Sequence, residues 1–271
     1  MLPAIEHLSA AMTDTAVLLC GHGSRDPEAL AEFGEAAAVL RPRLAAHDFA
    51  TAFLEFAPPT IGEGLALLQA RGARRILVIP AMLFAASHVK IDLPREIAQF
   101  RAANPSIDIH LGRDLGSDAR LVRATADRIG NVAPDRGAET LLVVVGRGTN
   151  DPPANAAVAA IARRLGERLG FGEAEAAYGG IAHPRLDAAL DRAARHGFRR
   201  IVVFPYFLFT GVLAKRVYAQ TDACAARFPE IEFIKVRHLG DHIAVVDAFV
   251  DRVAECLTAG IAEGDFCSIR S

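Results

Sequence analysis

Three side chains able to bind a divalent metal ion follow apolar runs in the first half of the chain. His22 lies between two glycines, Glu55 comes late in a second apolar run, and His88 follows a third. Two imidazoles and one carboxylate suit a first-row ion such as cobalt or iron and leave coordination positions open. The histidines could also accept protons near neutral pH, and Glu55 could relay a proton, balance charge or orient a histidine.

The surrounding segments predict how these side chains are positioned. Short apolar runs alternate with longer amphipathic segments, which predicts an α/β fold with a parallel sheet covered by helices on both faces. Ligands bind such sheets at the carboxyl ends of the strands, where all three side chains are expected. The strands are predicted at 16–20, 50–56, 75–80 and 107–111, and the helices at 27–40, 61–70, 90–103 and 118–129.

The second half of the sequence repeats the first. Gly21–Pro27 aligns with Gly146–Pro152, and Gly72–Pro80 aligns with Gly197–Pro205. A match that places glycines and prolines at the same turn positions indicates a tandem duplication. We therefore expect two similar domains, 1–135 and 136–271, each a roughly four-stranded parallel sheet with helices on both faces, and a short tail from about residue 259.

The two copies differ at the three metal-binding positions. Arg147, Gly180 and Leu213 stand in the second copy where the first has His22, Glu55 and His88. The residues that support the fold agree between the copies, so these differences concern side chains that could bind a metal ion. This pattern predicts that the N-terminal domain carries the catalytic residues and that the C-terminal domain lacks them.

Each of the three residues also has a purely structural interpretation. His22 could be a turn residue, Glu55 could form a salt bridge at the sheet edge, and His88 could be a hydrogen-bonded histidine of the core. Their placement at one edge of one sheet favours the functional interpretation over three separate structural ones.

Composition excludes several classes of protein. The 271 residues are 52% hydrophobic, which is enough for a packed core, and the net charge of −2 argues against a general nucleic-acid binder. No apolar run approaches the roughly 18 residues of a membrane span, and the N-terminus lacks the pattern of a signal peptide. The four cysteines are scattered, so neither a zinc site nor a disulfide framework is indicated. We expect a cytoplasmic protein.

Three motifs resemble those of the sirohydrochlorin chelatases, which are class II chelatases that insert cobalt or iron into a tetrapyrrole. They are Gly21-His22-Gly23-Ser24-Arg25, the segment Phe53–Thr60, and Pro80–Phe84 leading to Ser87-His88-Val89. The resemblance extends over about residues 14–258. It implies that His22 and His88 are metal-binding and catalytic, that Glu55 is their acidic partner, and that the chain is a long member carrying the domain twice.

The resemblance also implies substrates and partners. The tetrapyrrole sirohydrochlorin is a polycarboxylate, so its site needs cations, and Arg25, Lys90, Arg147 and Lys215 are the candidates. The substrate metal is expected to be Co2+, with Fe2+ next. The second half is expected to complete the cleft, so the protein is a monomer acting as an internal pseudo-dimer, or a homodimer.

No permanently bound cofactor is expected. Some long members of the family carry a cysteine motif for an iron–sulfur cluster near the C-terminus, whereas Cys267 is isolated here, so no cluster is predicted. One alternative function stays open at this point: a metal or tetrapyrrole carrier that uses the same histidine pair without turnover.

Overall fold

The structure is a computed structural model that describes residues 14–84, 88–134 and 137–262, without the side chains of residues 88–89 and 259–262. It contains two four-stranded parallel sheets of identical strand order, β2-β1-β3-β4 and β6-β5-β7-β8. This confirms the expected fold class of two tandem α/β domains. The strands are β1 (Thr15–Gly21), β2 (Asp48–Phe53), β3 (Arg75–Pro80), β4 (Asp108–Leu111), β5 (Thr140–Gly146), β6 (Glu173–Tyr178), β7 (Arg200–Pro205) and β8 (Glu232–Lys235).

Helices connect successive strands of each sheet. In chain order the helical segments are α2 (Pro27–Arg43), α3 (Ile61–Ala70), the π-helix η1 (His88–Asp92), α4 (Leu93–Ala103), α5 (Ala119–Val132), α6 (Pro152–Leu169), α7 (Leu186–Ala194), α8 (Val212–Arg227) and α9 (Ile243–Ala262). None of them, within the described part of the chain, combines the length and apolarity needed to cross a membrane.

Local sequence explains where the first helices begin. The carboxylate of Asp26 accepts a hydrogen bond from the backbone N–H of Glu28, and Pro27 occupies the first turn of α2. Thr60 and Glu63 form a reciprocal capping box at the start of α3. Both helices therefore begin at the predicted residues.

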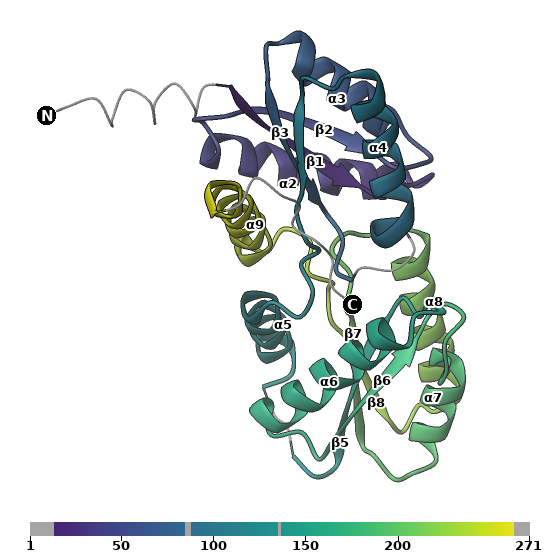
Figure 1. Cartoon of the computed structure of the whole chain (residues 1–271). Coiled ribbons are helices and arrows are strands. Elements are labelled where there is room, and N and C mark those ends of the chain that lie inside the picture. The colour runs from purple at the N-terminus through teal and green to yellow at the C-terminus, as the bar shows by residue number, and fades with distance from the viewer. Residues whose placement is uncertain (1–13, 85–87, 135–136, 263–271) are drawn as a thin grey trace, which may run out of the picture. The chain divides into compact units, whose positions relative to one another are not determined.

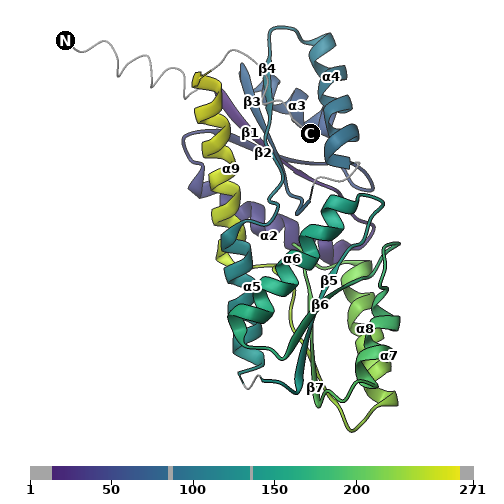
Figure 2. The same ribbon diagram turned by 60° about the horizontal axis from the view of Figure 1, so that its bottom comes forward.

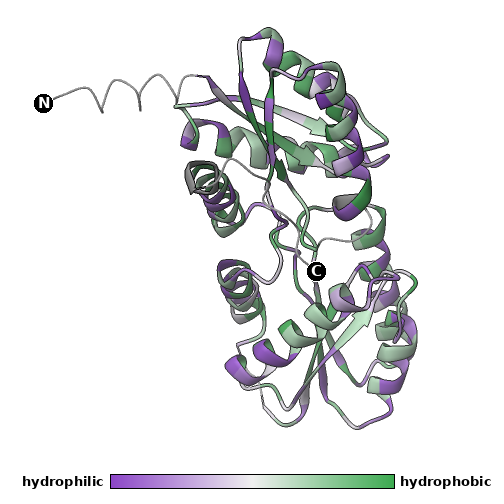
Figure 3. Ribbon diagram, in the orientation of Figure 1, coloured by the Kyte–Doolittle hydropathy of each residue, from purple (hydrophilic) through white to green (hydrophobic). Residues whose placement is uncertain are grey.

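Helices cover both faces of the first sheet (Figure 1). On one face, Leu18 and Val78 pack with Leu65 of α3 and Leu93 of α4 in a buried cluster. On the other face, α2 contributes Phe33, whose ring centroid lies 4.8 Å from that of Phe53. Apolar residues accordingly gather on the strands and on the inner faces of the helices (Figure 3).

The second sheet repeats this arrangement. Helices α7 and α8 lie on one face, and α6, with α5 beside it, on the other (Figure 2). Val143 and Val203 pack with Leu190 of α7 and Val217 of α8 in the buried cluster of that face. The two copies thus build their cores from corresponding residues, as expected of a duplication.

The last helix of each copy belongs to the compact unit of the other copy. One unit comprises residues 1–116 together with 246–271, and the other comprises residues 117–245. The predicted domains 1–135 and 136–271 follow the repeat in the sequence, whereas the compact units exchange α5 and α9. Buried apolar residues do not reveal from the sequence which of two similar sheets they will cover.

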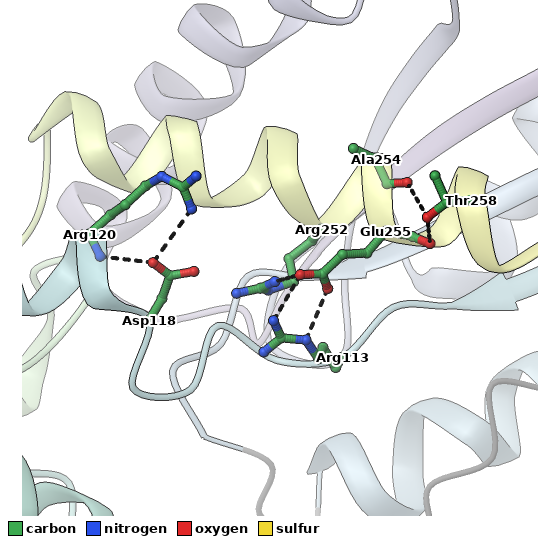
Figure 4. Close-up of polar contacts among 7 residues, drawn as sticks. All are labelled: Arg113, Asp118, Arg120, Arg252, Ala254, Glu255 and Thr258. Atoms are coloured by element: carbon green, nitrogen blue, oxygen red, sulfur yellow. Dashed lines mark hydrogen bonds and ion pairs between the residues drawn. The ribbon is translucent and has the colours of Figure 1, made fainter.

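Polar contacts hold each exchanged helix in its unit. Glu255 of α9 accepts hydrogen bonds from Arg113, at 2.8 and 2.9 Å, and pairs with Arg252, which is only 1% exposed (Figure 4). In the other unit, Arg128 of α5 donates to the carbonyl oxygen of Leu239 at 2.7 Å and to Asp241 at 2.6 Å.

Two predicted boundaries near the metal-binding positions were wrong. The second strand ends at Phe53 rather than at residue 56, because the backbone N–H of Phe53 donates to the carbonyl oxygen of Pro59 and closes a turn. The helix predicted at 90–103 is α-helical only from Leu93, because its first residues belong to the π-helix η1, a form often found at functional sites. Glu55 therefore lies in a turn and not within a strand.

Candidate functional site

His22 and Glu55 are brought together by the strand register of the first sheet. Gly21 at the end of β1 pairs with Phe53 at the end of β2. Backbone pairing continues beyond the strands. The N–H of Leu54 donates to the carbonyl oxygen of Gly21, and the N–H of Glu55 donates to the carbonyl oxygen of His22, each at 3.0 Å. The two side chains consequently leave adjacent backbones at the carboxyl edge of the sheet.

The imidazole of His22 contacts a different oxygen with each nitrogen. Its Nε2 lies 3.1 Å from Oε1 of Glu55, and its Nδ1 lies 3.2 Å from the carbonyl oxygen of Gly23. The side chains are partly open to solvent, at 24% for His22 and 38% for Glu55. A carbonyl oxygen can only accept, so Nδ1 carries a proton in this contact, and Nε2 and the carboxylate face each other across a gap that suits a cation.

That cation can be a proton or a metal ion. A proton on Nε2 makes an imidazolium that donates to Glu55. A divalent ion bound about 2.1 Å from each atom would be held by two ligands at roughly a right angle, a geometry typical of first-row metals. The pair can therefore exchange protons for metal at one place.

Gly23 permits this close approach. Its φ of 90° lies in the region that favours glycine, and a Cβ atom there would lie 1.7 Å from the carbonyl oxygen of Glu55. Any side chain at this position would push the turn that carries Glu55 away from the loop that carries His22. The second glycine of the Gly-His-Gly sequence is thus required by backbone packing.

The ring of Phe56 lies between the side chains of Arg25 and His22 in the described contacts. The guanidinium carbon of Arg25 lies 4.9 Å from the centroid of the Phe56 ring, a cation–π contact. The ring centroids of His22 and Phe56 are 6.1 Å apart. Phe56 is 51% exposed and has a φ of 66°.

The comparison of the two halves of the sequence did not predict a role for Phe56, because it considered only polar residues that differ between the copies. A signal was nevertheless present: Phe56 aligns with Ile181 and Arg25 aligns with Asn150, so both members of the cation–π pair change together with His22 and Glu55.

The third predicted ligand is only partly placed. The backbone of His88 begins η1, whereas its side chain and residues 85–87 lie outside the described residues. Lys90, in the same π-helix, is exposed. Among the side chains that the structure describes, no group of three histidine, cysteine or acidic residues gathers as a metal site. The structure therefore brings His22, Glu55 and Arg25 together and leaves the imidazole of His88 as a prediction.

The corresponding position of the second unit is closed. A Cβ atom on Gly180 would lie 2.4 Å from the carbonyl oxygen of Arg147, and one on Gly179 would lie 2.9 Å from the side chain of Leu213. A side chain at position 180 would therefore require the backbone of Arg147 to shift. Arg147, which follows β5, and Lys215, in the first turn of α8, are both exposed.

Comparison with known proteins adds relatives along nearly the whole chain. The sirohydrochlorin cobaltochelatase of Priestia megaterium is 31% identical over 94% of this chain and 84% of its own length. The sirohydrochlorin ferrochelatase of Bacillus subtilis (strain 168) is 30% identical over 93% of this chain and 94% of its own length.

Solved structures agree with these relatives. SirB from Bacillus subtilis with Fe3+ superposes with a TM-score of 0.83 at 28% identity, covering 93% of this chain and 99% of that one. The cobalt complex of SirB from Bacillus subtilis subspecies spizizenii gives a TM-score of 0.77 at 30% identity, covering 93% of this chain and 98% of that one.

The family model CbiX matches twice, at residues 16–132 and 141–256. The double match agrees with the two sheets of equal strand order and with the repeat in the sequence. On these grounds the chain belongs to the CbiX family, as a member that carries the domain twice.

Proposed function

We propose that this protein is a sirohydrochlorin chelatase, an enzyme that inserts a divalent metal ion into sirohydrochlorin. The observation that carries the proposal is the 3.1 Å approach of His22 Nε2 to Glu55 Oε1 at the carboxyl edge of the first sheet. The relatives named as chelatases of this tetrapyrrole support the choice of substrate.

His22 and Glu55 hold the metal ion in this proposal. The carbonyl oxygen of Gly23 fixes the proton on Nδ1 and orients the ring, so that Nε2 presents its lone pair to the ion. Glu55 lies on the same side as Nε2, which favours a role as second ligand and proton acceptor over a role in orienting the ring. Insertion releases two N–H protons from the macrocycle, and the vacated pair can take up protons as the metal departs.

His88 completes the metal-binding set in the proposal. It is the first residue of η1, which follows the carboxyl end of β3, the neighbour of β1 in the sheet. A second imidazole would allow the ion to be held loosely and then released to the macrocycle, since neutral histidine is a suitable ligand for both cobalt and iron.

Four cations are proposed to bind the carboxylates of the substrate. They are Arg25, Lys90, Arg147 and Lys215. Arginine can bind a carboxylate through two parallel hydrogen bonds, which fixes the orientation of a polycarboxylate ring better than a lysine does.

Co2+ is the proposed preferred ion, with Fe2+ next. Relatives of both specificities, a cobaltochelatase and a ferrochelatase, lie at almost the same identity. Cobalt would place the enzyme in cobalamin synthesis and iron in sirohaem synthesis.

The decisive experiment is anaerobic metal insertion into sirohydrochlorin, followed by absorbance, with cobalt(II), iron(II) and nickel(II) offered separately. Insertion above the spontaneous rate is expected, fastest with cobalt, and it should fall by about 10²-fold or more in His22→Ala and His88→Ala. Arg147→Ala should retain turnover with a raised KM for the tetrapyrrole.

The same experiment distinguishes the carrier. A protein that binds metal or tetrapyrrole stoichiometrically but accelerates insertion with none of the ions would overturn the chelatase proposal and identify a carrier that uses the same residues.

A further inference from the structure

Phe56 combines two features that neither local preference nor packing explains. It is the one non-glycine residue with a positive φ in the described part of the chain, at 66°, and its large apolar side chain is 51% exposed. A bulky residue in this region of backbone space is strained, and residues so strained concentrate at ligand clamps and active sites.

The position of the ring is set by the candidate site. Phe56 follows Glu55 directly in the chain. The backbone N–H of Glu55 donates to the backbone carbonyl oxygen of His22 at 3.0 Å, so this turn is hydrogen-bonded to the loop that carries His22. From that turn the ring lies against the guanidinium of Arg25, at 4.9 Å, and beside the imidazole of His22, at 6.1 Å between centroids. An exposed aromatic surface is therefore held next to the place where the metal would leave the protein.

The second copy of the domain provides an internal comparison. Ile181 aligns with Phe56 and Asn150 aligns with Arg25, so the second copy lacks both the ring and the cation. Ile181 is also exposed, at 58%, but it does not have a positive φ. Exposure at this turn is thus common to both copies, whereas the strained aromatic residue and its arginine occur only in the copy that has His22 and Glu55.

We propose that Phe56 is a substrate-binding and specificity-determining residue, whose ring packs against the tetrapyrrole while it holds Arg25 toward a carboxylate of the same molecule. This inference rests on the proposed function. A tetrapyrrole is a broad conjugated surface bordered by carboxylates, so its recognition needs an aromatic contact and a cation at a fixed distance from each other. The cation–π contact supplies that fixed distance, because it restrains a guanidinium that would otherwise be free to rotate.

The test is Phe56→Gly, which removes the ring and also the steric strain of the positive φ at this position. Glycine adopts a φ near 66° without steric cost, so the unfolding midpoint should stay the same or rise. The KM for sirohydrochlorin, and the Kd for metal-free sirohydrochlorin measured by absorbance titration, should rise by about tenfold. The half-saturating cobalt(II) concentration should stay near that of the wild type, because the ring is not a metal ligand.

Companion variants separate an aromatic requirement from a general apolar one. Phe56→Tyr should retain the wild-type KM for sirohydrochlorin, whereas Phe56→Leu should raise this KM as Phe56→Gly does. Ile181→Gly is the matched control at the equivalent turn, and it should leave the KM for sirohydrochlorin unchanged.

The outcomes distinguish this inference from the function on which it rests. A wild-type enzyme that metallates sirohydrochlorin, with a Phe56→Gly variant of equal KM and Kd, would overturn the role of Phe56 alone. A lower unfolding midpoint with unchanged binding would also overturn it, since the ring would then be structural. Failure of the wild-type protein to bind or metallate sirohydrochlorin would overturn the proposed function, and this inference with it.

Discussion

The Nε2 atom of His22 lies 3.1 Å from the Oε1 atom of Glu55, and no strand contains either residue. Both belong to turns just beyond β1 and β2, and their backbones remain hydrogen-bonded to each other there. Parallel pairing thus extends past the sheet and fixes the distance between an imidazole and a carboxylate.

Glu55→Gln should separate the charge of the carboxylate from its shape. The amide keeps the size of the side chain but cannot act as an anionic ligand or accept the proton, so cobalt(II) affinity should fall by roughly 10–100-fold, together with the rate of insertion. Isothermal titration with cobalt(II) checks the affinity. Glu63→Gln is the matched control, because Glu63 serves only the cap of α3 in the described contacts. Wild-type affinity in Glu55→Gln would rule out Glu55 as a ligand.

The closed second copy should resist restoration of a metal site. Gly180→Glu places a Cβ atom 2.4 Å from the carbonyl oxygen of Arg147, so we expect it to lower the free energy of unfolding by about 1–3 kcal/mol. The triple variant Arg147→His, Gly180→Glu and Leu213→His should bind no additional cobalt(II). Glu55→Gly in the first copy, which adds no atoms, is the control for stability. Denaturant unfolding and metal titration give both results, and a second equivalent of tightly bound cobalt would contradict the expectation.

Stability should depend on pH through Glu255. Burial alone would raise the pKa of this carboxyl, but hydrogen bonds and charge from Arg113 and Arg252 outweigh it and lower the pKa below 4.5. A carboxyl with a lowered folded-state pKa stabilises the protein above its unfolded pKa, and that contribution is lost as the pH falls through the folded value.

Glu255→Gln should therefore lower the free energy of unfolding by about 0.5–1 kcal/mol at pH 7, because solvent screens the ion pairs of a side chain that is 45% exposed, and the difference from the wild type should shrink below about pH 4.5. Urea unfolding at several pH values measures this. Glu167→Gln, on the exposed side of α6, should differ little from the wild type at any pH. A difference for Glu255→Gln that is independent of pH would show that the ion pair does not stabilise α9.

A fragment cut at the repeat boundary should not fold as a monomer. Residues 14–135 lack α9, which contributes the buried residues Phe249 and Val253 to the first unit. Its own α5 is the repeat equivalent of α9, so two copies could fold by exchanging α5 with each other. We expect the fragment to be unfolded when dilute and dimeric when folded, as measured by circular dichroism and sedimentation. A folded monomer would contradict the exchange of the last helices.

Much of the architecture could be read from the sequence because its causes are local. The helix α3 occupies the predicted residues, since a capping box begins it and an apolar stripe fixes its buried face. The glycines and prolines of the repeat predicted two sheets of the same kind. His22 and Glu55 could be placed at one edge because adjacent parallel strands end together.

The tertiary structure decided what depends on contacts between distant segments. The exchange of α5 and α9 follows from which sheet each buried face covers, and similar amphipathic patterns in the two copies do not encode that choice. The end of β2 at Phe53, the positive φ of Phe56 and the closure around Gly180 arise from backbones that approach within hydrogen-bonding or van der Waals distance. Which copy carries His22 and Glu55 can be read from the sequence, whereas the lack of room for a side chain at Gly180 depends on how closely the folded backbone of Arg147 approaches it.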